Sequence, residues 1–291
     1  MILNGIEEMR KLLPSINLRD DSTRLDDFVL RAQQWVTDTI IGENLEGTLE
    51  IEVSENVTDN HADLRLKVKR VIADKAYLMF GDEMNLQLGE AGMVVQNNQD
   101  MSAASSQRRD NLMRSLEDRL DHDCDTLVNY LMKNSVPHED DPRLPYESWR
   151  NTEQFAYFTV AFLPTMKELH RHLPIKTSYA GHWEDFNESL LNVSIRMMDI
   201  AASYVSTAEI VRLRALYREN GLNEVQHQAV FRLQSVAAAC IVDDQEQARK
   251  SAIGARTIML DFLDYFTSFA ASDCVNMSDV SFNAGHIVDT L

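Results

Sequence analysis

Residues 9–14 (MRKLLP) recur in altered form as residues 169–174 (LHRHLP). Each copy is followed by an Asp-Phe pair, at residues 27–28 and 185–186. The step from the Leu of Leu-Pro to that Asp is 14 residues in the first copy and 12 in the second. An apolar-periodic segment, typical of a helix with one buried face, includes or follows each pair. The chain is therefore predicted to contain two related helical modules.

The composition agrees with a helical protein. The chain has 291 residues, of which 44% are apolar and 25% are charged, so it is long enough to bury a sizeable core. Only 10 Gly and 6 Pro occur beside 13 Met, which favours helices over many strands and turns. We predict a mainly α fold made of two related helical-bundle modules.

In the first module the apolar period changes along the chain. Residues 42–61 are acidic, and the alternation at 49–53 (LEIEV) favours a short strand or an extended arm. A strand–turn–strand pattern at 86–96 predicts a small β-hairpin inserted in this module, followed by a polar loop. Helices are predicted at 24–41, 62–80 and 106–133.

The second module is expected to follow a linker rich in proline and acid. We place the first module at 1–137, the linker at 138–153, the second module at 154–270 and an extended C-terminal tail at 271–291. Helices of the second module are predicted at 183–203, 206–218, 223–242 and 246–270.

The charge of the chain is strongly acidic. A formal net charge of −18 argues against a conventional nucleic-acid binder, because phosphate contacts need clustered Lys and Arg. The stretch 38–63 contains eight acidic residues and no Lys or Arg. This run is either an ordinary solvated surface or a single-sign face that meets a basic partner or repels DNA phosphates.

The best metal-like grouping in the sequence is His170 and His172, with His182 nearby. On a helix, residues two apart point in different directions, so the first two could not chelate one ion together. The acidic cluster at 121–125 falls on the predicted helix 106–133 and reads mostly as a polar face. We predict no metal site.

Other chemistry is equally weak. Cys124, Cys240 and Cys274 are far apart and form no C-x-x-C pair, so they are interpreted as free thiols in a reducing compartment. No phosphate-binding loop, nucleophile elbow or zinc-protease motif occurs. We therefore predict no cofactor and no enzymatic activity. The chain also lacks an apolar run of about 20 residues and a secretory signal, so we expect a soluble protein without a membrane partner.

Several segments in this order resemble one known family. The chain is similar to the duplicated, mostly helical head–tail connector (adaptor or ring) proteins of tailed phages infecting Bacteroidetes, including crAss-like phages. The resemblance covers about residues 8–270. It is carried by residues 12–17 (LLPSIN), the helix with 27–28, the turn segment 88–93 (LGEAGM), the long helix with Leu112, and the second-half segments 162–164, 173–174 and 185–186.

The resemblance implies a structural protein of the virion neck, made in the host cytoplasm. Such proteins form rings, commonly dodecamers, below the portal protein, contact further neck or tail ring proteins, and pass genomic DNA without sequence-specific contacts. An acidic channel face would present no Lys or Arg to bind the DNA phosphates. The residues expected on that face are Glu43, Glu46, Glu50, Glu52 and Glu55.

In a ring each subunit has two different side faces, so extended elements that reach a neighbour suit the assembly. The predicted arms are residues 42–61, 86–106 and 271–291. Within them, the apolar residues expected at the portal or subunit interface are Leu88, Met93, Val95, Val280, Phe282 and Ile287. The alternative hypothesis is a cellular helical scaffold or regulatory protein that binds partners through its acidic arm.

Overall fold

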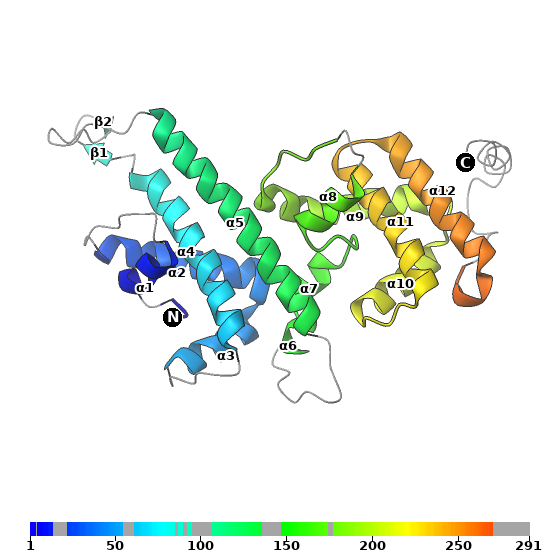
Figure 1. Cartoon of the computed structure of the whole chain (residues 1–291), viewed down its shortest axis with the longest axis horizontal. Coiled ribbons are helices and arrows are strands. Elements are labelled where there is room, and N and C mark those ends of the chain that lie inside the picture. Colours follow the sequence, from blue (N-terminus) through cyan, green and yellow to red (C-terminus); the bar gives the residue numbers. More distant parts are fainter. Residues whose placement is uncertain are drawn as a thin grey trace. The chain divides into compact units, whose positions relative to one another are not determined.

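The computed structural model describes residues 1–3, 5–13, 22–54, 61–84, 87–89, 92–94, 106–135, 147–173 and 177–269. Within these residues the chain is mainly α-helical, as predicted (Figure 1). The chain divides into two compact units, unit 1 (Met1–Phe155) and unit 2 (Ala156–Leu291).

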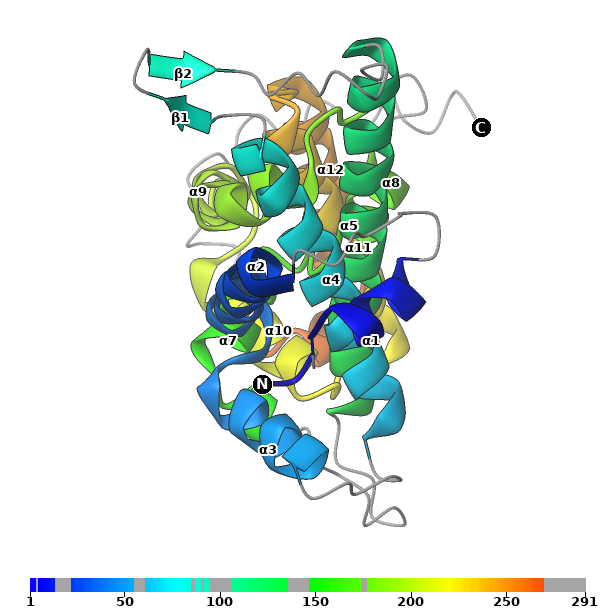
Figure 2. The ribbon, with the colours of Figure 1, turned by 90° about the vertical axis from the view of Figure 1, so that its left-hand side faces the viewer.

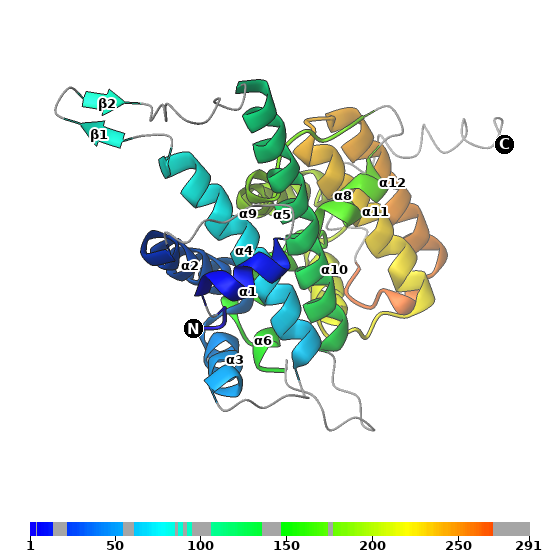
Figure 3. The same ribbon diagram turned by 60° about the vertical axis from the view of Figure 1, so that its left-hand side comes forward.

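Unit 1 is built around the long helix α4. Along the chain it contains α1 (Gly5–Leu12), α2 (Ser22–Val36), the π-helical turn η1 (Thr37–Ile41), α3 (Glu43–Ser54), α4 (Ala62–Met84), β1 (Gln87–Gly89), β2 (Gly92–Val94), α5 (Ser106–Asn134), α6 (Glu147–Arg150) and the start of α7 (Glu153–Phe158). α4 packs against both α2 and α5, and α1 lies across α2 and α4 (Figures 2 and 3). The helices predicted at 62–80 and 106–133 are confirmed; the first ends four residues later than predicted and the second one residue later.

The apolar period of α4 explains its central place. Leu64, Val68, Val71 and Ile72 are fully buried, and they recur at the three- and four-residue steps of one helical face. Between α4 and α5, β1 and β2 pair antiparallel, with Leu88 opposite Met93 in the register. The two residues that join the strands, and all side chains of this segment, lie outside the described residues.

The predicted arm at 42–61 is wrong over most of its length, because residues 43–54 form α3. Leu45 and Leu49 are fully buried, whereas Ile51 is exposed. A four-residue step places the two leucines on one helical face, and their burial against the rest of unit 1 outweighs the strand-like alternation at 49–53. Residues 55–60 lie outside the described residues.

The predicted linker 138–153 also needs correction, since its last part belongs to unit 1. Trp149 of α6 is fully buried, donates its indole N–H to the carbonyl of Ile40 at 2.7 Å, and packs edge-on against Phe155 at 5.2 Å between ring centroids. Burial of a tryptophan with its N–H paired ties this segment firmly to the core. The division between the units therefore falls after Phe155; residues 136–146 lie outside the described residues.

Unit 2 is built around α11. Its elements are the end of α7, α8 (Met166–His172), α9 (Trp183–Ala201), α10 (Thr207–Arg218), α11 (Glu224–Ile241), α12 (Gln245–Asp261) and the 3-10 turn η2 (Leu263–Tyr265). α11 packs against α8, α9 and α12. Residues 236–240 (VAAAC) of α11 are buried, and their small side chains allow close helix approach.

The helices predicted at 183–203, 206–218 and 223–242 are confirmed to within two residues at each end. Side-chain caps mark some of these starts: Asn223 accepts from the backbone N–H of Gln226, and Asp244 accepts from that of Gln247. The helix predicted at 246–270 is wrong at its end, because α12 stops at Asp261. Phe262 leaves the helical conformation, with φ −133° and ψ 47°. The tail at 271–291 lies outside the described residues.

Candidate functional site

The acidic residues of α3 were expected to form an open face, and their surroundings can now be stated. Glu43 is exposed, whereas Glu46 and Glu50 both accept from the Nε2 of Gln33, at 2.6 and 2.7 Å. The terminal ammonium of Met1 lies 2.7 Å from Glu50 Oε1. The hydrogen bond from this ammonium is the largest cause that holds the pKa of Glu50 below its usual range, and the hydrogen bond from Gln33 is the second.

Glu52 is engaged more tightly still. Its two oxygens contact His61 Nδ1 and, at 2.6 Å, Arg65 Nη1, and all three side chains are largely buried. Three of the five acids predicted for a DNA-channel face therefore bind groups of their own unit: Glu46, Glu50 and Glu52. Glu55 lies outside the described residues. These pairings reduce the negative electrostatic potential that the acidic run presents to an outside partner.

A shallow polar groove of about 400 Å³ opens beside the start of α3. Asp38, Glu43 and Glu153 line it together with amide and hydroxyl side chains. Gly42 forms part of its wall with φ +76°, and a Cβ there would come within 3.1 Å of Gln154 Oε1. The groove could accept a cationic group, since three of its lining residues are acidic.

The predicted interface residues are only partly within view. Leu88 and Met93 belong to β1 and β2, where the backbone is described and the side chains are not. Val95, Val280, Phe282 and Ile287 lie outside the described residues. Their proposed role is therefore still a prediction.

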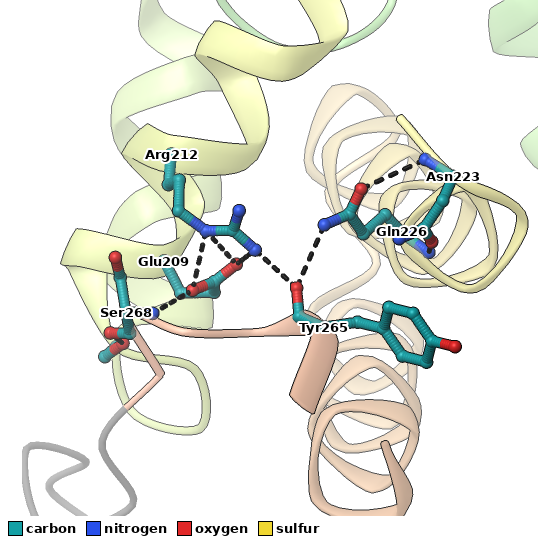
Figure 4. Close-up of polar contacts among 7 residues, drawn as sticks. Glu209, Arg212, Asn223, Gln226, Tyr265 and Ser268 are labelled. Carbon is teal, nitrogen blue, oxygen red and sulfur yellow. Dashed lines mark hydrogen bonds and ion pairs between the residues drawn. The ribbon is translucent and has the colours of Figure 1, made fainter. Parts of the chain in front are cut away.

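In unit 2 a polar network holds the chain that leaves α12 (Figure 4). Glu209 of α10 is fully buried, and its carboxylate accepts from Arg212 Nε at 3.0 and 3.2 Å and from the backbone N–H of Ser268 at 2.8 Å. The backbone carbonyl of Tyr265 accepts from Arg212 and, at 2.9 Å, from Gln226 Nε2. These bonds attach residues 265–268 to both α10 and α11.

Next to this network lies an apolar surface. A groove of about 420 Å³ runs between α11 and α12, lined by Glu224, His227, Gln228, Phe231, Arg232 and Ile258. Phe231 is 49% exposed, although the buried His172 ring lies 4.3 Å from it between centroids. One helical turn beyond Ile258, Phe262 is exposed too, as are Leu263 and Tyr265. Large exposed apolar side chains gathered in this way are typical of a binding surface.

His172 belongs to the metal-like histidine grouping of the sequence, and in the structure its ring is buried beside Ser235. Its Nδ1 lies 3.1 Å from Ser235 Oγ, and burial followed by the nearby Arg171 charge lowers its pKa to about 4. His170 is exposed on the other side of α8, and His182 precedes α9 as its N-cap. Among the described residues no three His, Cys, Asp or Glu side chains are placed to hold a metal ion together.

Asp74 of α4 is the second buried carboxylate of note. Its Oδ1 contacts Arg119 of α5, while its Oδ2 has no hydrogen-bond donor in the described part of the chain. Burial, with a smaller contribution from Asp123, raises the pKa of Asp74 to about 6 despite Arg119.

Sequence reasoning found neither the network around Glu209 nor the apolar surface. Glu209 and Arg212 stand three residues apart on a predicted helix, which is a common surface pair. The sequence predicts a continuous last helix over 246–270, which hides the exposed run at 262–265. A signal was present, because four of the five residues at 262–266 (FLDYF) are large and apolar, more than one helical face needs.

One family model matches about half of the chain. The model of a family of unknown function (DUF6712) matches residues 20–159, a span that starts just before α2 and ends close to the boundary of unit 1. No curated protein and no solved structure matches the chain. Within the described residues, none of the helices has the length and apolar character needed to cross a bilayer.

Proposed function

We propose that this chain is a structural protein of a phage neck, a head–tail connector or adaptor that forms a ring below the portal protein. Genomic DNA would pass through the ring, and further neck or tail ring proteins would bind below it. The proposal starts from the sequence resemblance, and the placement of the resembling segments supports it.

The observation that carries the proposal is the parallel order of helices in the two units. α1 ends where the first Leu-Pro begins, and α2 contains Phe28; α8 ends at the second Leu-Pro, and α9 contains Phe186. Both phenylalanines are buried. In each unit a later long helix, α4 or α11, packs against both the Asp-Phe helix and the long helix that follows it. This order supports two modules related by duplication, as in the resembling connectors.

Fewer acidic side chains of α3 are available to line the proposed channel. The acidic lining of the channel would depend on exposed carboxylates such as Glu43 and on the net charge of −18, because Glu46, Glu50 and Glu52 are engaged within unit 1. The six apolar interface residues keep their proposed role at the portal or at a neighbouring subunit.

The pairing of these carboxylates within unit 1 weighs against the alternative hypothesis, a scaffold or regulatory protein that binds through an acidic arm. That hypothesis needs a free acidic segment, whereas residues 43–54 form a helix with two buried leucines and three engaged carboxylates. The connector proposal does not depend on this segment being an arm.

The test is the mass of the purified full-length chain, alone and mixed with the portal protein of the same phage, by native mass spectrometry. We expect a twelve-subunit ring that joins the portal in a larger complex. A monomer that does not bind the portal protein at micromolar concentration would contradict the proposal and favour the alternative. An unrelated portal protein serves as the specificity control.

A further inference from the structure

We propose that the groove between α11 and α12 of one copy binds the C-terminal segment, residues 270–291, of a second copy. The inference rests on the proposed function, because a ring requires contacts between copies. It adds the surface that receives the segment and the chemistry by which the two fit.

The first support is the exposed apolar character of the groove. Phe231 lines it with one side against the His172 ring and half of its surface exposed. Ile258 faces it from α12, and Phe262 follows one turn later. Burying the exposed half of the Phe231 ring is favourable, so an occupant with matching apolar side chains would bind there.

The second support is charge. Arg232 lines the groove and is exposed, whereas Glu224, which lines it about two helical turns earlier on α11, carries the opposite charge. The aliphatic stem of Arg232 lies along α12, since a Cβ on Gly254 would be 3.4 Å from its Cδ. An occupant with apolar residues, and with an acidic residue beside Arg232 rather than beside Glu224, would complement this surface.

The segment 270–291 has that composition. Val275, Met277, Val280 and Phe282 form two apolar pairs, each with one residue between its members. Asp273, Asp279 and Asp289 supply negative charge, and the segment contains no Lys or Arg. An extended chain spans about 3.3 Å per residue, so these 22 residues could reach about 70 Å from Phe269.

The proposed ring, in which copies must contact one another, favours a second copy over the same copy as the source of the segment. Figure 4 shows the Tyr265 ring on the side of α11, whereas Ser268 lies beside α10. There the Ser268 N–H bonds to Glu209, and the Ser268 carbonyl accepts from Ser206 Oγ at 2.9 Å. The last described residues thus lie along α10, while the groove of the same copy lies between α11 and α12. A head-to-tail contact in which each copy gives one segment and receives another suits a closed ring.

The decisive experiment is photo-crosslinking in the full-length chain. Phe282 is replaced by benzoylphenylalanine in an unlabelled copy, which is mixed with a ¹⁵N-labelled copy that keeps Phe282. We expect cross-linked peptides that join position 282 of the unlabelled copy to α11 or α12 of the labelled copy. Links within one copy, links only to other surfaces, or no links at all would each overturn the inference.

A matched pair of substitutions tests the receiving surface. Phe231→Ser should weaken self-association about tenfold or more, as expected for a central aromatic contact. Leu191→Ser on α9, where Leu191 is 51% exposed, should change it less than about twofold. Arg232→Glu should weaken it by an amount that shrinks in high salt. If Phe231→Ser loses helicity, Phe282→Ser tests the same contact from the other side; equal effects of Phe282→Ser and Leu191→Ser would overturn the inference.

The two proposals can fail separately. Cross-links between copies at α11 or α12, in a chain that does not bind the portal protein, would support this inference and contradict the connector function. Rings that bind the portal while position 282 links only to portal residues would do the reverse.

Discussion

Asp74 of unit 1 and Glu209 of unit 2 are deeply buried carboxylates that each lie beside an arginine, and the surroundings of the two differ. In unit 1, Asp74 contacts Arg119, keeps one oxygen without a donor among the described residues, and has Asp123 nearby. In unit 2, Glu209 receives donors on both oxygens, from Arg212 and from the Ser268 backbone. A buried charge is tolerated where donors reach it from several directions. Two packed helices supply too few donors for Asp74, whereas the chain after α12 folds over Glu209 and completes its set.

This comparison predicts its largest effect at Glu209. Glu209→Ala should lower the free energy of unfolding by about 3–5 kcal/mol, because it leaves Arg212 and the Ser268 N–H without their shared acceptor. Urea unfolding followed by circular dichroism measures the loss, and hydrogen exchange at residues 263–269 should report local release of the segment.

Glu219→Ala is the matched control, since Glu219 is exposed just beyond the same helix. Its effect should stay within about 0.5 kcal/mol. A loss at Glu209 no larger than this would show that the network does not hold the segment.

A smaller effect of opposite sign is expected at Asp74. Its folded pKa of about 6 lies above the ordinary aspartate value of 3.8, so the folded state binds this proton more tightly than the unfolded state does. The contribution of Asp74 is present below about pH 4 and is lost as the pH rises through about 6. Asp74→Asn should therefore stabilise the protein by about 1–3 kcal/mol at pH 7.5 and make little difference at pH 4. Urea unfolding at both pH values measures this.

His172 contributes with the opposite sign, because its lowered pKa makes unit 2 lose stability as the pH falls from about 6.5 towards 4. The wild type and Asp74→Asn share that contribution, so it cancels in their difference. Asp118→Asn, at an exposed position on α5, controls for a general charge effect. A pH-independent difference between Asp74→Asn and the wild type would refute the assignment.

The smallest effects compare one glycine from each unit. Gly42→Ala should destabilise unit 1 by about 1–2 kcal/mol, because φ is +76° and the new Cβ would come within 3.1 Å of Gln154 and 3.2 Å of Thr152. Gly254→Ala, in the middle of α12, should stabilise unit 2 by about 0.5–1 kcal/mol, since its Cβ would meet Arg232 at an ordinary 3.4 Å. Thermal unfolding of both variants measures this; equal effects of the same sign would contradict it.

Most helices could be predicted because their apolar periods are long and undisturbed. The run from Leu64 to Ala76 recurs on one face of α4, and Gly221 and Asn223 mark the break before α11. α3 was missed because its five-residue alternation resembles a strand, while its two buried leucines are a weak signal by themselves. The segment around Trp149 was missed because prolines and acids just before it indicated a linker.

The candidate surfaces were less predictable than the helices. Glu46, Glu50 and Glu52 form one acidic run in the sequence, but their partners Met1, Gln33, His61 and Arg65 are near neighbours only after α3 packs against unit 1. Phe231 and Ile258 are 27 residues apart, and only the packing of α11 against α12 places them in one groove.

By itself the sequence determined that the chain is mainly helical, where its long helices run, and that two Leu-Pro and Asp-Phe segments repeat in the same order. Those features depend on local propensity and on apolar periods, which act over a few turns of chain. The tertiary structure alone decided which carboxylates are paired, which aromatic rings stay exposed, and which side chains hold residues 265–268. These depend on which residues distant in sequence meet, and hence on helix packing.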